Sequence, residues 1–227
     1  MRIIECEQGS EIWHKARAGV ITASMFKVAR ERMKVSRGDK KAGDFTDAAL
    51  KYAFRVAIER ISGEPLDEGF ETWQMRRGHE LEPEARAEHE TQAGVIVERC
   101  GFVTTDDGVF GGSADGFIGD KEGSEYKCLT SPDGLRSVLL NGDLSEFTDQ
   151  IQGCLWLTGR EAWHFGLFCP ALRPIGKQLY WRVIRRDDDY IAEMERDLLD
   201  FRRQVDQYEA ALRRPANDAA WPFPKAA

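Results

Sequence analysis

The sequence lacks the features of a membrane protein, a disulfide scaffold or a zinc protein. No apolar run approaches the roughly 18–20 residues that a bilayer span needs. The N-terminal MRIIECEQGSEIW has no basic segment followed by an apolar one, so we expect no signal peptide and no membrane partner. The five cysteines are scattered, odd in number and without CxxC spacing, which predicts reduced thiols in a cytoplasm. The four histidines are scattered too, which argues against a zinc enzyme.

A single globular domain is the simplest organisation for this chain. Its 227 residues fit one domain, and 42% hydrophobic with 31% charged residues is ordinary for a folded protein. We expect one domain over residues 1–214 and a flexible tail over 215–227. The net charge of −7 weighs against a nucleic-acid partner. However, the segment from Lys27 to Lys41 is strongly basic, and it is either a DNA path or a solvated surface.

Hydrophobic periodicity predicts helices at both ends of the chain and strands in the middle. The caps Ser10 and Gly19 bound a first helix, and Thr22 or Ser24 is expected to cap a second. The expected helices span 10–19, 22–33, 45–63, 71–94, 147–159 and 187–214, and the expected strands fall in 95–129, 161–170 and 178–186. This order predicts an α/β (α+β) domain, with a central mixed sheet flanked by helices.

The segment GGSADGFIGDKEGSEYKC places two acids and a lysine close together. Glu125 and Lys127 are two residues apart on an expected strand, so their side chains point to the same face. The preceding turn can return Asp115 beside them. Two carboxylates and the main-chain carbonyl of Tyr126 would suit Mg²⁺, and the lysine would orient or deprotonate a water or neutralise charge on a phosphate. A surface hairpin that carries charge is the alternative.

Two helical segments carry further polar side chains. RGHELEPEAR holds three glutamates ahead of the strands, and DQIQGCLWLTG holds Gln150 and Gln152 in an otherwise apolar helix. Exposed helices are rich in Glu, and Gln is common on the wetter face of a buried helix. Taken alone, neither segment therefore indicates a function.

In order and spacing, five segments resemble the phage lambda exonuclease family, the YqaJ-type viral recombinases of the PD-(D/E)xK nuclease superfamily. The segments are WHKARAGVITAS, RGHELEPEAR, GGSADGFIG, EYKC and DQIQGCLWLTG, and the resemblance covers about residues 8–210. It implies a restriction-endonuclease-like core. It also implies that Asp115 and Glu125 bind the metal, that Lys127 is catalytic, and that Glu82 and Gln150 complete the site.

The resemblance further implies that Arg17 and Ser24 hold the 5′-phosphate of a DNA end. An arginine fork binds phosphate bidentately, and a Ser-capped helix start presents N–H groups to an anion. A surface salt bridge from Arg17 to Glu11 or a neighbour and a plain helix cap at Ser24 are the alternatives. The chain departs from the family after the ExK strand, where Asp133 replaces an arginine and Arg136 is the nearest arginine.

The activity that the resemblance implies is a Mg²⁺-dependent 5′→3′ exonuclease on linear double-stranded DNA with a 5′-phosphate end. It would use two ions per site, with Mn²⁺ as an alternative, and leave 5′-mononucleotides and a 3′ single strand. The resemblance also implies a ring-shaped homotrimer, a single-strand annealing protein as partner, and a phage or prophage protein in a bacterial cytoplasm. The rival functions are an endonuclease, a helicase-associated nuclease, and a DNA-end-binding protein that does not cut.

Overall fold

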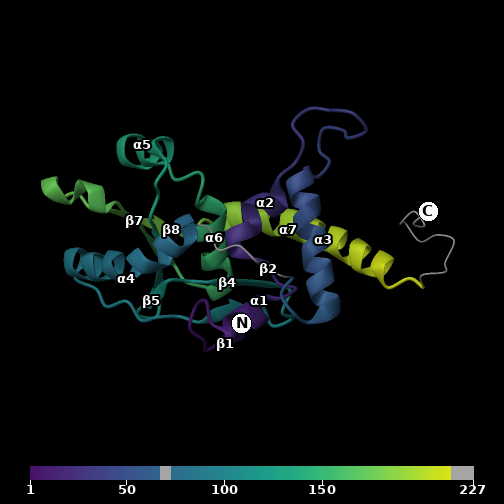
Figure 1. Cartoon of the computed structure of the whole chain (residues 1–227), viewed down its shortest axis with the longest axis horizontal. Coiled ribbons are helices and arrows are strands. Elements are labelled where there is room, and N and C mark those ends of the chain that lie inside the picture. The colour runs from purple at the N-terminus through teal and green to yellow at the C-terminus, as the bar shows by residue number, and fades with distance from the viewer. Residues whose placement is uncertain (67–72, 216–227) are drawn as a thin grey trace.

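The computed structural model describes residues 1–66 and 73–215, in which helices surround two sheets (Figure 1). The helices, with 3-10 turns as η, are α1 (Glu11–Arg17), η1 (Ala23–Met25), α2 (Phe26–Arg30), α3 (Asp47–Ser62), α4 (Trp73–Ala93), α5 (Pro132–Asn141), α6 (Thr148–Thr158), η2 (Pro170–Ile175) and α7 (Asp188–Leu212). The strands are β1 (Arg2–Ile4), β2 (Ile21–Thr22), β3 (Phe102–Thr104), β4 (Phe110–Ser113), β5 (Gly116–Ile118), β6 (Glu122–Lys127), β7 (Ala162–Phe168) and β8 (Leu179–Arg185). The predicted mixed α/β class is confirmed.

The strands form two four-stranded mixed sheets, where one central sheet was predicted. The first has the order β1-β3-β4-β2 and the second β5-β6-β7-β8. In each sheet one pair is parallel, β2 with β4 and β6 with β7. The chain leaves the first sheet at Ser113 and enters the second at Gly116, so Asp115 lies at the crossing. Sequence alone does not reveal this split, because two short strands two residues apart look like one.

Several predicted helix ends are confirmed by their caps. The Ser10 hydroxyl accepts the N–H of Trp13 at 3.2 Å and begins α1. Gly63 ends α3 with a φ of 71°, in the left-handed region that favours glycine. The Asp187 carboxylate accepts the N–H of Tyr190 at 2.9 Å and begins α7. Among the described residues, no helix is both long and apolar enough to cross a membrane.

The second predicted helix is wrong at its start. Ile21–Thr22 is the strand β2, Ser24 lies within η1, and Met25 occupies the cap position of α2 without a capping side chain. Neither Thr22 nor Ser24 therefore caps α2. The sequence also missed β1 and α5, whereas α4 runs on through Pro83 without a break. The predicted tail lies, from residue 216 onward, outside the described residues, and the single-domain organisation stays a prediction.

The basic segment from Lys27 to Lys41 is largely neutralised by acids from elsewhere in the chain. Four of its seven cations form ion pairs, which are Lys27 with Glu146, Arg30 with Asp149 and Asp197, Arg32 with Asp200, and Lys40 with Asp47. Most of these partners lie more than 100 residues away along the chain. These four side chains are paired within the chain, and a DNA path along this segment stays a prediction.

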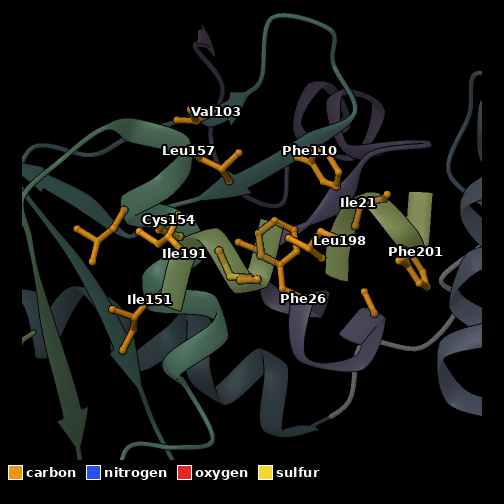
Figure 2. Packing of buried hydrophobic residues seen from close by; sticks show 14 of the residues in the cluster. Ile21, Phe26, Val103, Phe110, Ile151, Cys154, Leu157, Ile191, Leu198 and Phe201 are labelled. Atoms are coloured by element: carbon orange, nitrogen blue, oxygen red, sulfur yellow. The ribbon is translucent and has the colours of Figure 1, made fainter. Parts of the chain in front are cut away.

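The main core is formed by helices α2, α3, α6 and α7 with residues of both sheets. Phe26 is fully buried at its centre, with its ring centroid 6.3 Å from that of Phe110 and 6.1 Å from that of Trp156. Figure 2 shows Phe26 among core side chains that come from α6, α7 and β4. Burial of one such ring contributes about 2–3 kcal/mol. This packing fixes α6 and α7 against the sheets.

Two glycine–aromatic pairs fix the fit between β6 and β7. Gly123 lies opposite Trp163 in the ladder, and Tyr126 lies opposite Gly166. A Cβ on Gly123 would come within 2.4 Å of the Trp163 ring, and one on Gly166 within 2.7 Å of the Tyr126 ring. Each large ring therefore covers a position that only glycine can occupy.

Gly153 of α6 provides a test of the core packing. A Cβ there would lie 2.6 Å from the Phe26 ring. We expect Gly153→Ala to lower the free energy of unfolding by about 1–3 kcal/mol, since overpacking outweighs the helix propensity of alanine. The control is Gly78→Ala in α4, where no described atom lies within 4 Å, and it should be neutral or stabilise by up to about 1 kcal/mol. Urea unfolding of both variants would measure this, and equal effects would contradict it.

Candidate active site

Asp115 is held beside β6 by a main-chain hydrogen bond. The β5–β6 ladder ends at the pair of Gly116 with Ser124, so Tyr126 of β6 lies beyond the end of β5. The N–H of Tyr126 donates instead to Oδ2 of Asp115 at 2.6 Å. Because the N–H and C=O of one strand residue point to the same side, the Tyr126 carbonyl also faces Asp115. The structure thus brings together Asp115 and the carbonyl that the sequence paired with it.

Glu125, Lys127 and Gln150 form a closed set of hydrogen bonds. The Nζ of Lys127 donates to Oε1 of Glu125 at 2.6 Å and to Oε1 of Gln150 at 3.0 Å. The Nε2 of Gln150, on α6, donates to the same Oε1 of Glu125 at 2.7 Å. Glu125 is 3% exposed, and its Oε2 is buried without a hydrogen-bond partner. One oxygen of this carboxylate thus accepts two hydrogen bonds, and the other accepts none.

Glu82 approaches the acids from α4. Together with Asp115 it lines a cavity of about 530 Å³. Its carboxylate lies 3.7 Å from Arg86, one turn along the helix. Leu81 and Ala85 pack α4 onto the second sheet and so fix its position. Within the described part of the chain, no three His, Cys, Asp or Glu side chains lie close enough together to hold a metal ion.

Negative charge accumulates at this site and perturbs its titration. Burial raises the pKa of Asp115 well above its usual value, and the charges of Glu125 and Glu82 raise it further. Burial, and then the charge of Glu125, also raise the pKa of Glu82, against the lowering effect of Arg86. Burial would lower the pKa of Lys127, but Glu125 and Asp115 raise it above the usual value. Lys127 is therefore protonated in this geometry and acts as a cation and a donor.

These residues fit a hard divalent cation. Mg²⁺ prefers carboxylate and carbonyl oxygens and keeps several waters. Asp115, the partnerless Oε2 of Glu125 and the Tyr126 carbonyl offer such oxygens. A cation would also offset the charge that raises the pKa of Asp115.

Of the polar helix residues flagged in the sequence, Gln150 and Glu82 belong to the site and their neighbours do not. Gln152 is buried, donates to the carbonyl of Arg185 and accepts the N–H of Asp187, both at 3.0 Å. It therefore ties α6 to the β8–α7 connection. Glu84 forms an ion pair with Arg173 instead of facing the acids.

Arg17 and Ser24 line a second cavity, of about 580 Å³. The Arg17 guanidinium lies 4.1 Å from the centre of the Trp13 ring, and no ion pair among the described residues involves Arg17, so the alternative pairing with Glu11 is not formed. Ser24 contributes its hydroxyl to this cavity but not the N-terminus of an α-helix, since α2 begins after it. His79 lines both cavities, so the two lie side by side.

Comparison with known proteins identifies the family. Residues 12–161 match the YqaJ-like viral recombinase domain. The chain belongs to the YqaJ-like viral recombinase family. An alkaline exonuclease from Laribacter hongkongensis, LHK-Exo, is 28% identical, with a TM-score of 0.74 over 89% of this chain and 96% of that one. Its structure in complex with dAMP has a TM-score of 0.76 at the same identity and coverage.

Two further proteins agree in fold or in part of the sequence. A phage-related exonuclease from Haemophilus somnus 129PT is 18% identical, with a TM-score of 0.63 over 85% of this chain and 96% of that one, which shows the shared fold. A protein of Escherichia coli K12 named ExoD is 29% identical over 68 residues, which are 30% of this chain and 76% of that protein.

Arg136, the nearest arginine to the family's phosphate-binding position, does not reach either cavity. It lies on α5, is 69% exposed, and comes no closer than 4.0 Å to Asp133 on the same helix. It lines neither cavity. Figure 1 shows α5 well separated from α1 and α3, which line the second cavity. The structure thus does not bring Arg136 together with Arg17 and Ser24.

Sequence reasoning missed a buried histidine network behind the site. His89 Nδ1 lies 2.9 Å from the Tyr126 hydroxyl, and its Nε2 lies 3.0 Å from Nδ1 of His164. Nε2 of His164 lies 3.1 Å from the Glu122 carboxylate. An ionised carboxylate only accepts, so each ring donates toward Glu122 and Tyr126 donates to His89. The network ties α4, which carries Glu82, to β6. No local sequence signal connects residues so far apart.

His89 should make the fold sensitive to mild acid. Burial, and the adjacent His164 ring, lower the pKa of His89 from 6.5 to about 4. Between these values the unfolded chain binds a proton that the folded chain does not, so the free energy of unfolding falls as pH drops, by up to about 3 kcal/mol. We expect His89→Gln to be less stable at pH 7.5 but to lose less stability between pH 6.5 and 4. Denaturant unfolding across this range would test it, and parallel curves for the two proteins would refute it.

Proposed function

We propose that the protein is a Mg²⁺-dependent 5′→3′ exonuclease that degrades one strand of linear double-stranded DNA to 5′-mononucleotides and leaves 3′ single strands for recombination by annealing. Family membership and the 28% identical alkaline exonuclease support a phage-type exonuclease. The observation that carries the metal-dependent part is Glu125, whose buried Oε2 has no hydrogen-bond partner in a cluster of acids.

Each residue of the acidic cluster and its hydrogen-bond partners has a role in this proposal. Asp115, Glu125 and the Tyr126 carbonyl would hold Mg²⁺. When bound, Mg²⁺ supplies a Lewis acid that activates water and offsets charge on the phosphate. The protonated Lys127, fixed by Glu125 and Gln150, donates to the attacking water or to a phosphate oxygen. Glu82, whose raised pKa favours proton exchange, positions that water from the opposite side.

The second cavity supports a reaction that starts at a 5′ end. Arg17 and Ser24 would bind a terminal phosphate there, next to the acids of the first cavity. A strand whose end is held in one cavity presents its next phosphodiester to the other. Release of a nucleoside monophosphate also fits the dAMP that the Laribacter exonuclease binds. The homotrimeric ring, the annealing partner and the phage or prophage setting in a bacterial cytoplasm stay predictions of the resemblance.

Mg²⁺ binding should be visible without activity. A ligand that binds the folded state raises the midpoint of thermal unfolding. We expect 10 mM-range Mg²⁺, on the order of 100 times a weak site's Kd, to stabilise the unmodified protein by about 2–3 kcal/mol. Glu125→Gln should abolish this gain, since it removes the charge but keeps the shape. Glu80→Gln, an exposed neighbour of Glu82 that lines neither cavity, is the control and should keep it. An undiminished gain in Glu125→Gln would exclude Glu125 as a ligand.

The reaction itself is tested with one end-labelled linear duplex, carrying 5′-phosphate or 5′-hydroxyl ends, in Mg²⁺ or EDTA. We expect Mg²⁺-dependent release of 5′-mononucleotides, faster from phosphorylated ends. Lys127→Ala should lower the rate by about 100-fold or more, because a preorganised donor is lost. A closed circular duplex should resist digestion.

Other outcomes of this digestion point to the rival functions. Cutting of closed circles would indicate an endonuclease. Duplex binding without cleavage by the unmodified protein would indicate an end-binding protein. Release of nucleotides from the 3′ end would overturn the proposed polarity while leaving the site intact.

A further inference from the structure

The peptide group that leads into Asp115 is held at both ends. It lies in the crossing from β4 to β5, between the two sheets. Its N–H, which is that of Asp115, donates to the Ser124 carbonyl at 3.1 Å. Its C=O, which is that of Ala114, accepts Nε2 of Gln8 at 2.9 Å. Because a peptide group is planar, these two bonds fix its orientation and so restrict the direction in which Asp115 leaves the chain.

The Ala114 carbonyl depends on Gln8 because it lies outside both strand ladders. The β3–β4 ladder ends at Ser113 and the β5–β6 ladder begins at Gly116. Ala114 is 2% exposed, and a buried carbonyl without a donor is unfavourable. Loss of the Gln8 amide would therefore favour rotation of this peptide group toward another donor. Asp115 would turn with it, since the same group contains its nitrogen.

Gln8 is placed for this contact by a tight turn ahead of α1. The N–H of Ser10 donates to the Glu7 carbonyl at 3.1 Å, and Gly9 has a φ of 82°, in the left-handed region that favours glycine. Ser10 also caps α1, so the turn and the helix are joined. Gln8 is half-buried and lines the first cavity together with Asp115. The amide thus comes from a segment whose own backbone is held by hydrogen bonds.

A second hydrogen bond joins the same N-terminal segment to the crossing. Nε1 of Trp13, on α1, donates to Oγ of Ser113 at 2.7 Å. Ser113 directly precedes Ala114, so residues 8 and 13 contact consecutive residues of the crossing. The N-terminal segment therefore supports the backbone on which Asp115 depends, although it is distant in the sequence.

We infer that Gln8 is a positioning residue of the metal site, because its amide sets the peptide group from which Asp115 presents its carboxylate to Mg²⁺. This rests on the proposed function, which takes Asp115 as a Mg²⁺ ligand. The Nε2 of Gln8 donates to the main chain, so Gln8 acts on the metal through Asp115. Mutation of a residue that holds a metal ligand in place typically costs about 10–100-fold in metal affinity.

The test titrates the full chain with Mg²⁺ in the absence of DNA, so that it does not depend on cleavage. The midpoint of thermal unfolding in EDTA reports the fold, and its rise with Mg²⁺ concentration gives the Kd. Gln8→Met keeps the length of the side chain and removes the donor, and we expect it to raise the Kd for Mg²⁺ about ten-fold or more. Gln8→Asn keeps the amide on a shorter side chain and should raise the Kd less.

Gln92→Met is the matched control and should keep the Kd. Gln92 lies on α4, donates to Glu88 of the same helix at 2.8 Å, and lines neither cavity. An equal rise of the Kd in this control would contradict the inference, because the effect would then not be specific to Gln8.

The other outcomes separate the inference from the proposed function. An unchanged Kd in Gln8→Met would overturn the inference whatever the midpoint in EDTA, because Gln8 would then serve the fold alone. Absence of Glu125-dependent Mg²⁺ binding in the unmodified protein would overturn both the inference and the metal-dependent function. If Gln8→Met weakens Mg²⁺ binding but the unmodified protein digests no DNA, the inference stands and the proposed exonuclease function fails.

Discussion

The hydrogen bond from the Tyr126 N–H to Asp115 is the contact on which the site depends. It replaces the strand partner that β6 loses where β5 ends, so a carboxylate takes over from a carbonyl in the ladder. The same bond fixes the crossing between the two sheets and turns the Tyr126 carbonyl toward the acids. Glu125 and Lys127 then point to α6, while the Tyr126 side chain points to α4. The carboxylates therefore come together beside β6, some from the face covered by α6 and some from the face covered by α4.

Concentrating acids in this way is costly, and the surrounding structure offsets part of the cost. Lys127 and Gln150 satisfy one oxygen of Glu125, and Arg86 lies near Glu82. The second oxygen of Glu125 is left without a hydrogen-bond donor, and the pKa of Asp115 stays raised. A buried carboxylate oxygen without a donor, beside an acid whose pKa is raised, is what a cation site offers before its ligand binds.

The sequence predicted what depends on near neighbours and missed what depends on distant ones. The caps of α1, α3 and α7 and the shared face of Glu125 and Lys127 follow from local rules, and the structure has them. Strand β2 has two residues and no pattern of its own, so its segment looked like a helix start. The segment from Lys27 to Lys41 looked basic because acids that pair with Arg30 and Arg32 lie far along the chain, on α6 and α7. Gln150 and Gln152 differ in role because the fold places Gln150 beside Glu125 and Lys127 and Gln152 beside the β8–α7 connection.

The glycine–aromatic pairs of β6 and β7 have a consequence for the charged site. A slip of one residue between these parallel strands would set Trp163 and Tyr126 against side chains instead of glycines. It would also turn one strand's side chains over relative to the other's, and carry Glu125 away from Gln150. The two glycines therefore fix the register of β6 against β7. Only in this register do the charged residues of the site come together.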